Sequence, residues 1–89
     1  MLEPVYKNKF KQDIERMKKR GKQLKKLHEI IFILINQQIL PFKCRDHALR
    51  GQYSDYRECH IEPDWLMIYF LEENNIVFVR TGSHADLFG

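Results

Sequence analysis

Residues able to move protons or bind phosphate gather in the second half of this 89-residue chain. His47 lies in an Asp-His-Ala-Leu segment, and His60 precedes Asp64 in a His-Ile-Glu-Pro-Asp segment. The last apolar run ends at Arg80, and His84 follows it after Thr-Gly-Ser. Histidine exchanges protons near neutral pH, a carboxylate accepts or orients them, and arginine offers paired donors to phosphate. This set of residue types suits acid–base chemistry on a phosphate ester.

Cleavage of RNA without a metal is one reaction that these residue types can perform. A base removes the proton of the ribose 2′-hydroxyl, an acid protonates the leaving 5′-oxygen, and cations stabilise the charged transition state. Aromatic rings stack on unpaired bases, for which Trp65 and Phe88 are candidates. Structural interpretations compete with each assignment, since Arg80 can pair with Glu58 or Asp64 across a sheet and Trp65 can belong to the core.

Two helices are predicted in the first half of the chain, after a short strand at residues 5–7. Apolar residues recur at helical spacing from Asn8, which we expect to cap the first helix, and Gly21 should end it. A second apolar stripe begins near Lys22 and continues until Pro41 excludes further helix. Because one glycine separates the two helices, they should fold back on each other as a hairpin.

The second half of the chain is typical of β-structure. Residues 41–55 lack periodicity and predict a long structured loop, and the segment 84–88 predicts one closing helical turn. Runs rich in β-branched and aromatic residues predict antiparallel strands at 56–61, 65–71 and 76–81. The sequence therefore predicts one domain over residues 1–89, of the α+β class. Its N-terminal helical hairpin should pack on a small, mostly antiparallel four-stranded sheet.

Strand alternation places candidate residues on shared faces of that sheet. Glu58 and His60 lie on the same face of their strand, and Arg80 is expected to share a face with Phe78. The last strand runs antiparallel to the middle one, so its end returns to the turn that follows His60. Arg80 and His84 are therefore expected to approach His60.

Positive charge is concentrated in the first half of the chain. Residues 1–38 carry ten lysines and arginines against four acidic residues, while residues 39–89 carry five against eight. Such a face attracts phosphate backbones, although a plain solvated helix surface is the competing interpretation. The cations that we expect to contact RNA backbone are Lys18, Lys19, Arg20, Lys22, Lys25 and Lys26.

The two cysteines raise the alternative of a zinc site. Cys44 and His47 have Cys-x-x-His spacing, and Cys59 adjoins His60. Neighbours on a regular strand point to opposite faces, however, so Cys59 and His60 do not readily share one ion. No Cys-x-x-Cys pair is present either. We therefore expect neither a metal nor another cofactor.

The location of the protein is predicted from what the sequence lacks. Two cysteines are too few for a disulfide scaffold and fit a reducing cytoplasm. The longest apolar run, Ile30–Ile35, is far shorter than the roughly 20 residues of a membrane span. The first ten residues contain no apolar signal core. We expect a cytoplasmic protein without a membrane partner.

Three motifs of the second half occur together and in order. They are an Asp-His-x-Leu-x-Gly loop from Asp46, a His-x-x-Pro-Asp turn from His60, and a Gly-Ser-His ending followed by Leu-Phe. With these motifs the chain resembles the YafQ-type branch of the RelE superfamily of bacterial toxins, densely over residues 46–89. The helical first half agrees with that family in pattern and length.

The resemblance implies a metal-independent endoribonuclease that cuts messenger RNA on the ribosome, with contacts to 16S ribosomal RNA, and stops translation. It also implies a cognate antitoxin, with operator DNA bound only through the toxin–antitoxin complex. The alternative is a non-catalytic module that binds nucleic acid or antitoxin in operon repression. The family's functional positions fall on His47, His60, Asp64, His84 and Phe88, with Arg80 and Trp65 as supporting positions and Glu58 as a weaker one.

Within the implied site we expect each residue to have a separate role. His84 is the expected general acid, and Asp64, together with His60, belongs to the base side. His47 and Arg80 are expected to position phosphate and stabilise its charge. Phe88 is expected to stack on the substrate.

Overall fold

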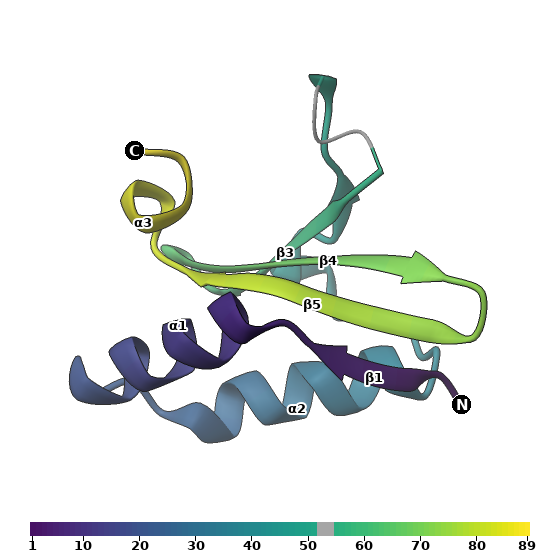
Figure 1. Ribbon diagram of the computed structural model, residues 1–89, viewed down its shortest axis with the longest axis horizontal. Coiled ribbons are helices and arrows are strands. Elements are labelled where there is room, and N and C mark those ends of the chain that lie inside the picture. The colour runs from purple at the N-terminus through teal and green to yellow at the C-terminus, as the bar shows by residue number, and fades with distance from the viewer. Residues whose placement is uncertain (52–54) are drawn as a thin grey trace.

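The computed structural model describes residues 1–51 and 55–89, so residues 52–54 of the predicted loop lie outside the described residues. Within these ranges the chain forms an α+β fold (Figure 1). Its elements in chain order are β1 (Glu3–Tyr6), α1 (Asn8–Lys19), α2 (Leu24–Ile35), η1 (Phe42–Cys44), β2 (His47–Ala48), β3 (Arg57–Glu62), β4 (Trp65–Glu72), β5 (Asn75–Gly82) and α3 (His84–Phe88).

The sheet has five strands in the order β1-β5-β4-β3-β2, so the predicted number of four is wrong. The additional strand, β2, consists of His47 and Ala48 and pairs antiparallel with β3. A two-residue strand has no alternating pattern that a sequence can display, so the sequence predicts only a loop at this position. β1 runs parallel to β5, and the remaining pairs are antiparallel, which confirms the predicted antiparallel order of β3, β4 and β5.

The predicted helical hairpin is present between β1 and η1, with changed ends. Asn8 is the first residue of α1 rather than its cap, and Lys7 at the N-cap makes no side-chain capping hydrogen bond. Gly21 follows α1 with φ +82°, a left-handed conformation that glycine adopts readily. α2 begins at Leu24 and ends at Ile35, well before Pro41.

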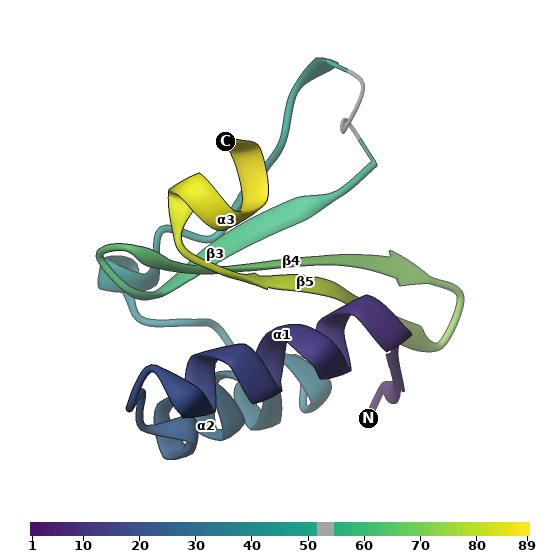
Figure 2. The same cartoon turned by 60° about the vertical axis from the view of Figure 1, so that its left-hand side comes forward.

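The two long helices, α1 and α2, cover only one face of the sheet. Both views show α1 and α2 on the same side, while α3 lies over the opposite face near the end of β5 (Figures 1 and 2). The core between the helices and the sheet includes fully buried side chains from both layers, among them Phe10, Met17, Leu27, Trp65 and Phe78. The other face of the sheet is therefore the open face, and the candidate site is built on it.

Candidate active site

Strand register aligns predicted site residues in two rows across the sheet. In the first row His47 pairs with Glu58, Glu58 with Ile68, and Ile68 with Arg80. In the second row His60 pairs with Leu66, and Leu66 with Gly82. Since adjacent strands lie about 4.8 Å apart, the backbones of His60 and Gly82 are separated by about 10 Å. The end of β5 therefore lies near His60, as predicted.

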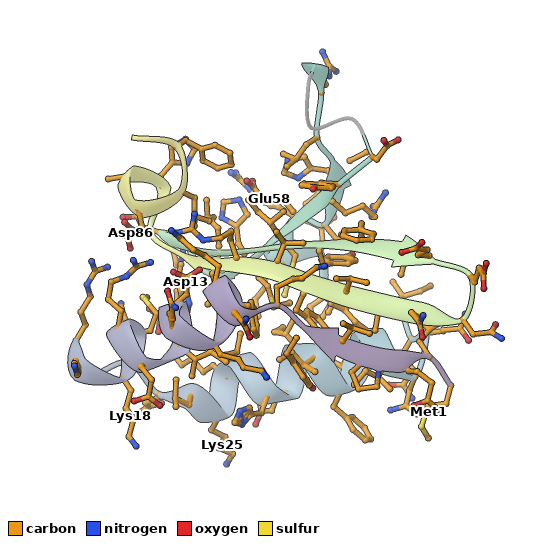
Figure 3. The ribbon with its side chains drawn as sticks, in the orientation of Figure 1. Met1, Asp13, Lys18, Lys25, Glu58 and Asp86 are labelled. Carbon is orange, nitrogen blue, oxygen red and sulfur yellow. The ribbon has the colours of Figure 1, made fainter. Side chains whose placement is uncertain are left out.

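Glu58 lies at the centre of this arrangement. Its side chain rises from the sheet on the face opposite α1 and α2 (Figure 3), and the residue is only 5% exposed. Glu58 Oε1 lies 3.6 Å from Nε2 of His47 and 3.7 Å from Nε2 of His60. Sequence alone ranked this residue as the weakest candidate, but the structure places its carboxylate between two imidazoles.

Backbone carbonyls fix the other side of both imidazole rings. His47 Nδ1 lies 2.6 Å from the carbonyl oxygen of Arg45, and His60 Nδ1 lies 3.2 Å from that of Pro63. Because a carbonyl only accepts hydrogen bonds, each Nδ1 acts as the donor. Each Nε2 is thereby directed towards Glu58, where it can gain and lose a proton.

Arg80 does not pair with Glu58 or Asp64. A bulge between Phe78 and Arg80 changes the register, so Arg80 pairs with Ile68 and the predicted shared face with Phe78 is wrong. The guanidinium donates to the buried Asp13 on α1 through Nε at 2.7 Å and Nη2 at 3.2 Å. Hydrogen bonds to Asp13 raise the pKa of Arg80, so this residue stays cationic.

His84 and Phe88 occupy α3, the short helix that was predicted as a closing turn. Their rings pack at a centroid distance of 5.1 Å. Asp64 Oδ1 accepts a hydrogen bond from the backbone N–H of His84 at 2.9 Å. Asp64 therefore orients the first residue of α3, a contact that differs from the proton-accepting role expected from sequence.

α3 is attached to α1 by an ion pair. Ser83 and Asp86 form a reciprocal capping box at its N-terminus. Asp86 also accepts two hydrogen bonds from Arg20, at 2.6 and 2.9 Å, and its carboxylate appears beside α1 in Figure 3. This pairing, more than any other interaction, holds the pKa of Asp86 well below its usual range. The residues Arg20, Ser83 and Asp86, here termed the tail clamp, fix the helix that carries His84.

The side chain of Trp65 is completely buried between the sheet and the helices, so it offers no exposed surface to a base. The indole Nε1 donates to Thr81 Oγ1 at 2.9 Å, and that hydroxyl donates to the carbonyl of Leu66 at 2.7 Å. The prediction that Trp65 binds substrate directly is therefore wrong. Its hydrogen bond instead connects the start of β4 to the end of β5, from which His84 follows.

The predicted basic face is divided by internal ion pairs. Lys22 and Lys26 both contact Glu62 at 2.8 Å, and Arg20 belongs to the tail clamp. Lys18 and Lys25 point away from the sheet on the outer side of the helices (Figure 3). With Lys19, they have no ion pair to a residue within 1–51 or 55–89, so of the six cations predicted to contact RNA only these three remain fully available to phosphate.

The cysteine-containing zinc arrangement is not formed. Cys44 and Cys59 belong to the hydrophobic core, where burial raises the pKa of both thiols. His47 and His60 instead face Glu58. No group of three or more histidine, cysteine or acidic side chains in the described part of the chain has the arrangement of a metal site.

Two acidic residues that organise this region, Asp13 and Asp86, were not among the predicted site residues. Asp13 accepts from Arg80, from Arg16 at 2.9 Å and from the backbone N–H of Thr81 at 3.1 Å. Asp86 anchors α3. Asp13 interrupts an apolar helix stripe, a signal of a buried charge, but two of its partners, Arg80 and Thr81, are more than sixty residues away. Asp86 follows Ser83 by three residues, which is the signature of a capping box.

Comparison with known proteins gives consistent matches over the whole chain. A family model described as "Bacterial toxin of type II toxin-antitoxin system, YafQ" matches residues 2–89. The mRNA interferase toxin YafQ of Escherichia coli strain K12 is 41% identical over 85 residues, covering 94% of this chain and 92% of the relative. Among the residues described, no helix is long and apolar enough to span a membrane.

Solved structures agree with these matches. The fold is similar to a chain in the crystal structure of the E. coli DinJ–YafQ complex, with a TM-score of 0.92, 39% identity and complete coverage of both chains. It is also similar to a metal-bound toxin from Helicobacter pylori, with a TM-score of 0.93 and 40% identity, covering 99% of this chain and 100% of the other.

Proposed function

Because this chain belongs to the YafQ family of bacterial type II toxins, we propose that it is an endoribonuclease that cleaves messenger RNA on the ribosome and inhibits translation. The observation that carries the proposal is the Glu58 carboxylate between His47 and His60 on the open face of the sheet. Together with His84 at the adjacent end of β5, these side chains supply groups for both proton transfers that RNA cleavage requires.

Glu58 and His60 form the base side of the reaction. Nε2 of His60 lies close to the Glu58 carboxylate, which stabilises the imidazolium formed when the ring accepts the 2′-hydroxyl proton. Asp64, expected from sequence as a base, is a positioning residue in this mechanism because its carboxylate accepts the backbone N–H of His84.

His84 acts as the general acid and protonates the leaving 5′-oxygen. Its side chain is exposed at the first turn of α3 and packs against Phe88, which is 41% exposed and offers a surface to a base. His47 in its protonated form and Arg80 stabilise charge on the phosphate. Arg80 keeps its orientation through Asp13, so its position does not depend on substrate.

The partners of this activity follow from the same family membership. The related E. coli toxin was solved in complex with DinJ, and we propose that a cognate antitoxin likewise holds this chain inactive. Operator DNA is then bound only through the toxin–antitoxin complex. We place the activity in the bacterial cytoplasm, where programmed ribosomes present message and 16S ribosomal RNA contacts the toxin.

The test is message cleavage on programmed ribosomes, with and without EDTA, by the wild type, His84→Ala and His28→Ala. His28 is an exposed histidine on α2 and provides the matched control. Cleavage by the wild type and His28→Ala in EDTA, with a loss of about 100-fold or more for His84→Ala, supports the proposal. Equal cleavage by all three proteins assigns the acid to another residue. With Mg²⁺ kept in excess of EDTA so that the ribosomes stay intact, cleavage that EDTA abolishes contradicts the metal-free mechanism, and no cleavage by any protein favours a binding module.

A further inference from the structure

We propose that Phe42 and Lys43 form a subsite for an unpaired RNA nucleotide next to the cleaved bond, an inference that rests on the function proposed above. The base stacks on the ring of Phe42, and a neighbouring phosphate pairs with Lys43 or Arg45. These residues lie before the first of the three sequence motifs, in the segment that the sequence predicts only as a structured loop.

Phe42 is the most exposed large apolar side chain among residues 1–51 and 55–89, at 99%. It opens η1, and the third residue of that turn, Cys44, is buried in the core. The turn is closed by a 2.9 Å hydrogen bond from Cys44 N to the Pro41 carbonyl. Burying a phenylalanine side chain stabilises a fold, so a fixed turn that holds the ring in solvent forgoes that stabilisation. Stacking with a base recovers it on binding.

Phe42 stands between two hollows of the surface. The first has a volume of about 620 Å³, and its walls include Phe42, Lys43, Arg45 and His60. The second has a volume of about 510 Å³ and shares Phe42 and Arg45 with the first. Since the ring belongs to both walls, a planar group can approach it from either hollow.

The charges around the first hollow favour a polyanion. Its walls carry the cations Lys26, Lys43 and Arg45 and a single carboxylate, that of Glu62. Glu62 is already paired with Lys26 and with Lys22. Neither Lys43 nor Arg45 forms an ion pair within the described ranges, so both are available to phosphate.

The same turn leads directly into the candidate active site. Arg45 adopts a left-handed conformation with φ +50°, and its carbonyl accepts the hydrogen bond of His47 Nδ1. His60 forms part of the first hollow together with Phe42. An RNA strand whose cleaved phosphate lies beside His60 therefore continues along this hollow towards Phe42.

An apolar peptide is the competing occupant, because Ile39 is also exposed, at 96%, beside the second hollow. Two features favour the nucleotide over a peptide. The cations lie on the side of Phe42 that also holds His60, and an aromatic ring between basic side chains is the usual composition of a single-strand binding surface.

The decisive experiment measures binding of an uncleavable 2′-O-methyl RNA oligonucleotide to the purified toxin by fluorescence anisotropy. Phe42→Ala is expected to weaken binding about tenfold, Phe42→Trp to retain it, and Phe42→Leu to resemble Phe42→Ala. Phe32→Ala, on α2, is the matched control because Phe32 is 64% exposed and lines neither hollow. Equal affinity of Phe42→Leu and wild type overturns stacking.

Abasic oligonucleotides then identify the stacked base. An abasic residue at the stacked position is expected to weaken wild-type binding about tenfold and to have no effect on Phe42→Ala. If the abasic residue and Phe42→Ala weaken binding additively at every position of the oligonucleotide, the subsite is wrong. Lys43→Gln is expected to reduce the slope of log affinity against log salt by about 0.7, and an unchanged slope contradicts the phosphate contact.

Cleavage on programmed ribosomes separates this subsite from the proposed function. If the wild type cleaves message but Phe42→Ala binds the oligonucleotide as well as the wild type does, the subsite is wrong and the proposed ribonuclease function stands. If the base stacks on Phe42 but the wild type does not cleave message, the subsite stands and the proposed ribonuclease function is wrong. Unchanged RNA binding by Phe42→Ala, with lost neutralisation by the co-expressed cognate antitoxin, assigns Phe42 to a protein partner and overturns the proposal.

Discussion

The two sides of the candidate site are built differently. The sheet side carries Glu58, with His47 and His60, on paired strands, and the central carboxylate is buried. The tail side carries His84 and Phe88 on a five-residue helix with no buried residue, attached through polar contacts to Asp64 and the tail clamp. On the sheet side, burial holds the Glu58 side chain in place. On the tail side, the position of α3 depends on a few hydrogen bonds. Elements with few buried contacts open first, so we expect motion of the site to be concentrated in α3.

The largest loss is expected from Glu58→Gln, which breaks the sheet side. Glutamine keeps the shape of the side chain but removes the charge that both imidazoles face. We expect ribosomal cleavage to fall by about 100-fold or more, while the thermal unfolding midpoint changes little. Single-turnover cleavage and circular dichroism melting measure the two effects.

Glu72→Gln, at the exposed end of β4, controls for loss of a carboxylate from the sheet. Cleavage by Glu58→Gln at the wild-type rate excludes Glu58 from the chemistry, and the base side then rests on His60 alone.

Sequence predicted the sheet side better than the tail side for a physical reason. Strand positions follow from alternation and apolar runs, so the sequence alone predicts that Glu58 and His60 share one face of their strand. The bulge that turns Arg80 away from Phe78's face leaves no local signature, and Asp13 and Asp86 find their arginines through the tertiary fold. At Phe42 the sequence gives the wrong expectation, because an apolar side chain is expected in the core and this one is exposed.

Asp13→Asn tests the connection between the two sides, and its effect should be the second largest. Asp13 is almost completely buried and holds Arg80 and the backbone N–H of Thr81 at the end of β5. Removing its charge leaves the partly buried Arg80 without a counterion. We expect the free energy of unfolding to fall by about 2 kcal/mol and cleavage by about tenfold.

Urea unfolding and ribosomal cleavage report these two quantities for Asp13→Asn. Glu15→Gln on the same helix is the control, since Glu15 is exposed. Unchanged stability together with unchanged cleavage would show that Arg80 keeps its position without Asp13.

Arg20→Ala breaks the tail side without touching any reacting group. It removes both hydrogen bonds to Asp86, so amide exchange in α3 is expected to accelerate while exchange in β3 and β4 stays unchanged. Cleavage should fall by about threefold to tenfold, and Arg20→Lys, which keeps the charge but not the paired donors, should lie between Arg20→Ala and wild type. If amide exchange in α3 of Arg20→Ala is as slow as in the wild type, α3 does not depend on the tail clamp.

The pH dependence of amide protection in α3 tests the ion pair between Asp86 and Arg20. The pKa of Asp86 is lower in the folded protein than in the unfolded chain, so its stabilising contribution is complete above the unfolded pKa of about 4. That contribution is lost only as the pH falls through the lower, folded value. We therefore expect α3 exchange rates, corrected for intrinsic chemistry, to stay constant between about pH 6 and 8. A change in α3 protection within that range contradicts this assignment.

The smallest effect is expected from a region that belongs to neither side. Lys18, Lys19 and Lys25 lie outside the ion pairs formed by Arg20, Lys22 and Lys26, so their neutralisation removes phosphate contacts without breaking internal ones. The triple glutamine variant is expected to bind ribosomes less than about tenfold more weakly at moderate salt, with a shallower salt dependence and an unchanged cleavage rate at saturation. Lys22→Gln combined with Lys26→Gln is the comparison, because it also releases Glu62 and should lower stability slightly. Sedimentation with ribosomes over a salt series measures the slope, and equal slopes for the wild type and the triple variant would leave these lysines with a solvation role only.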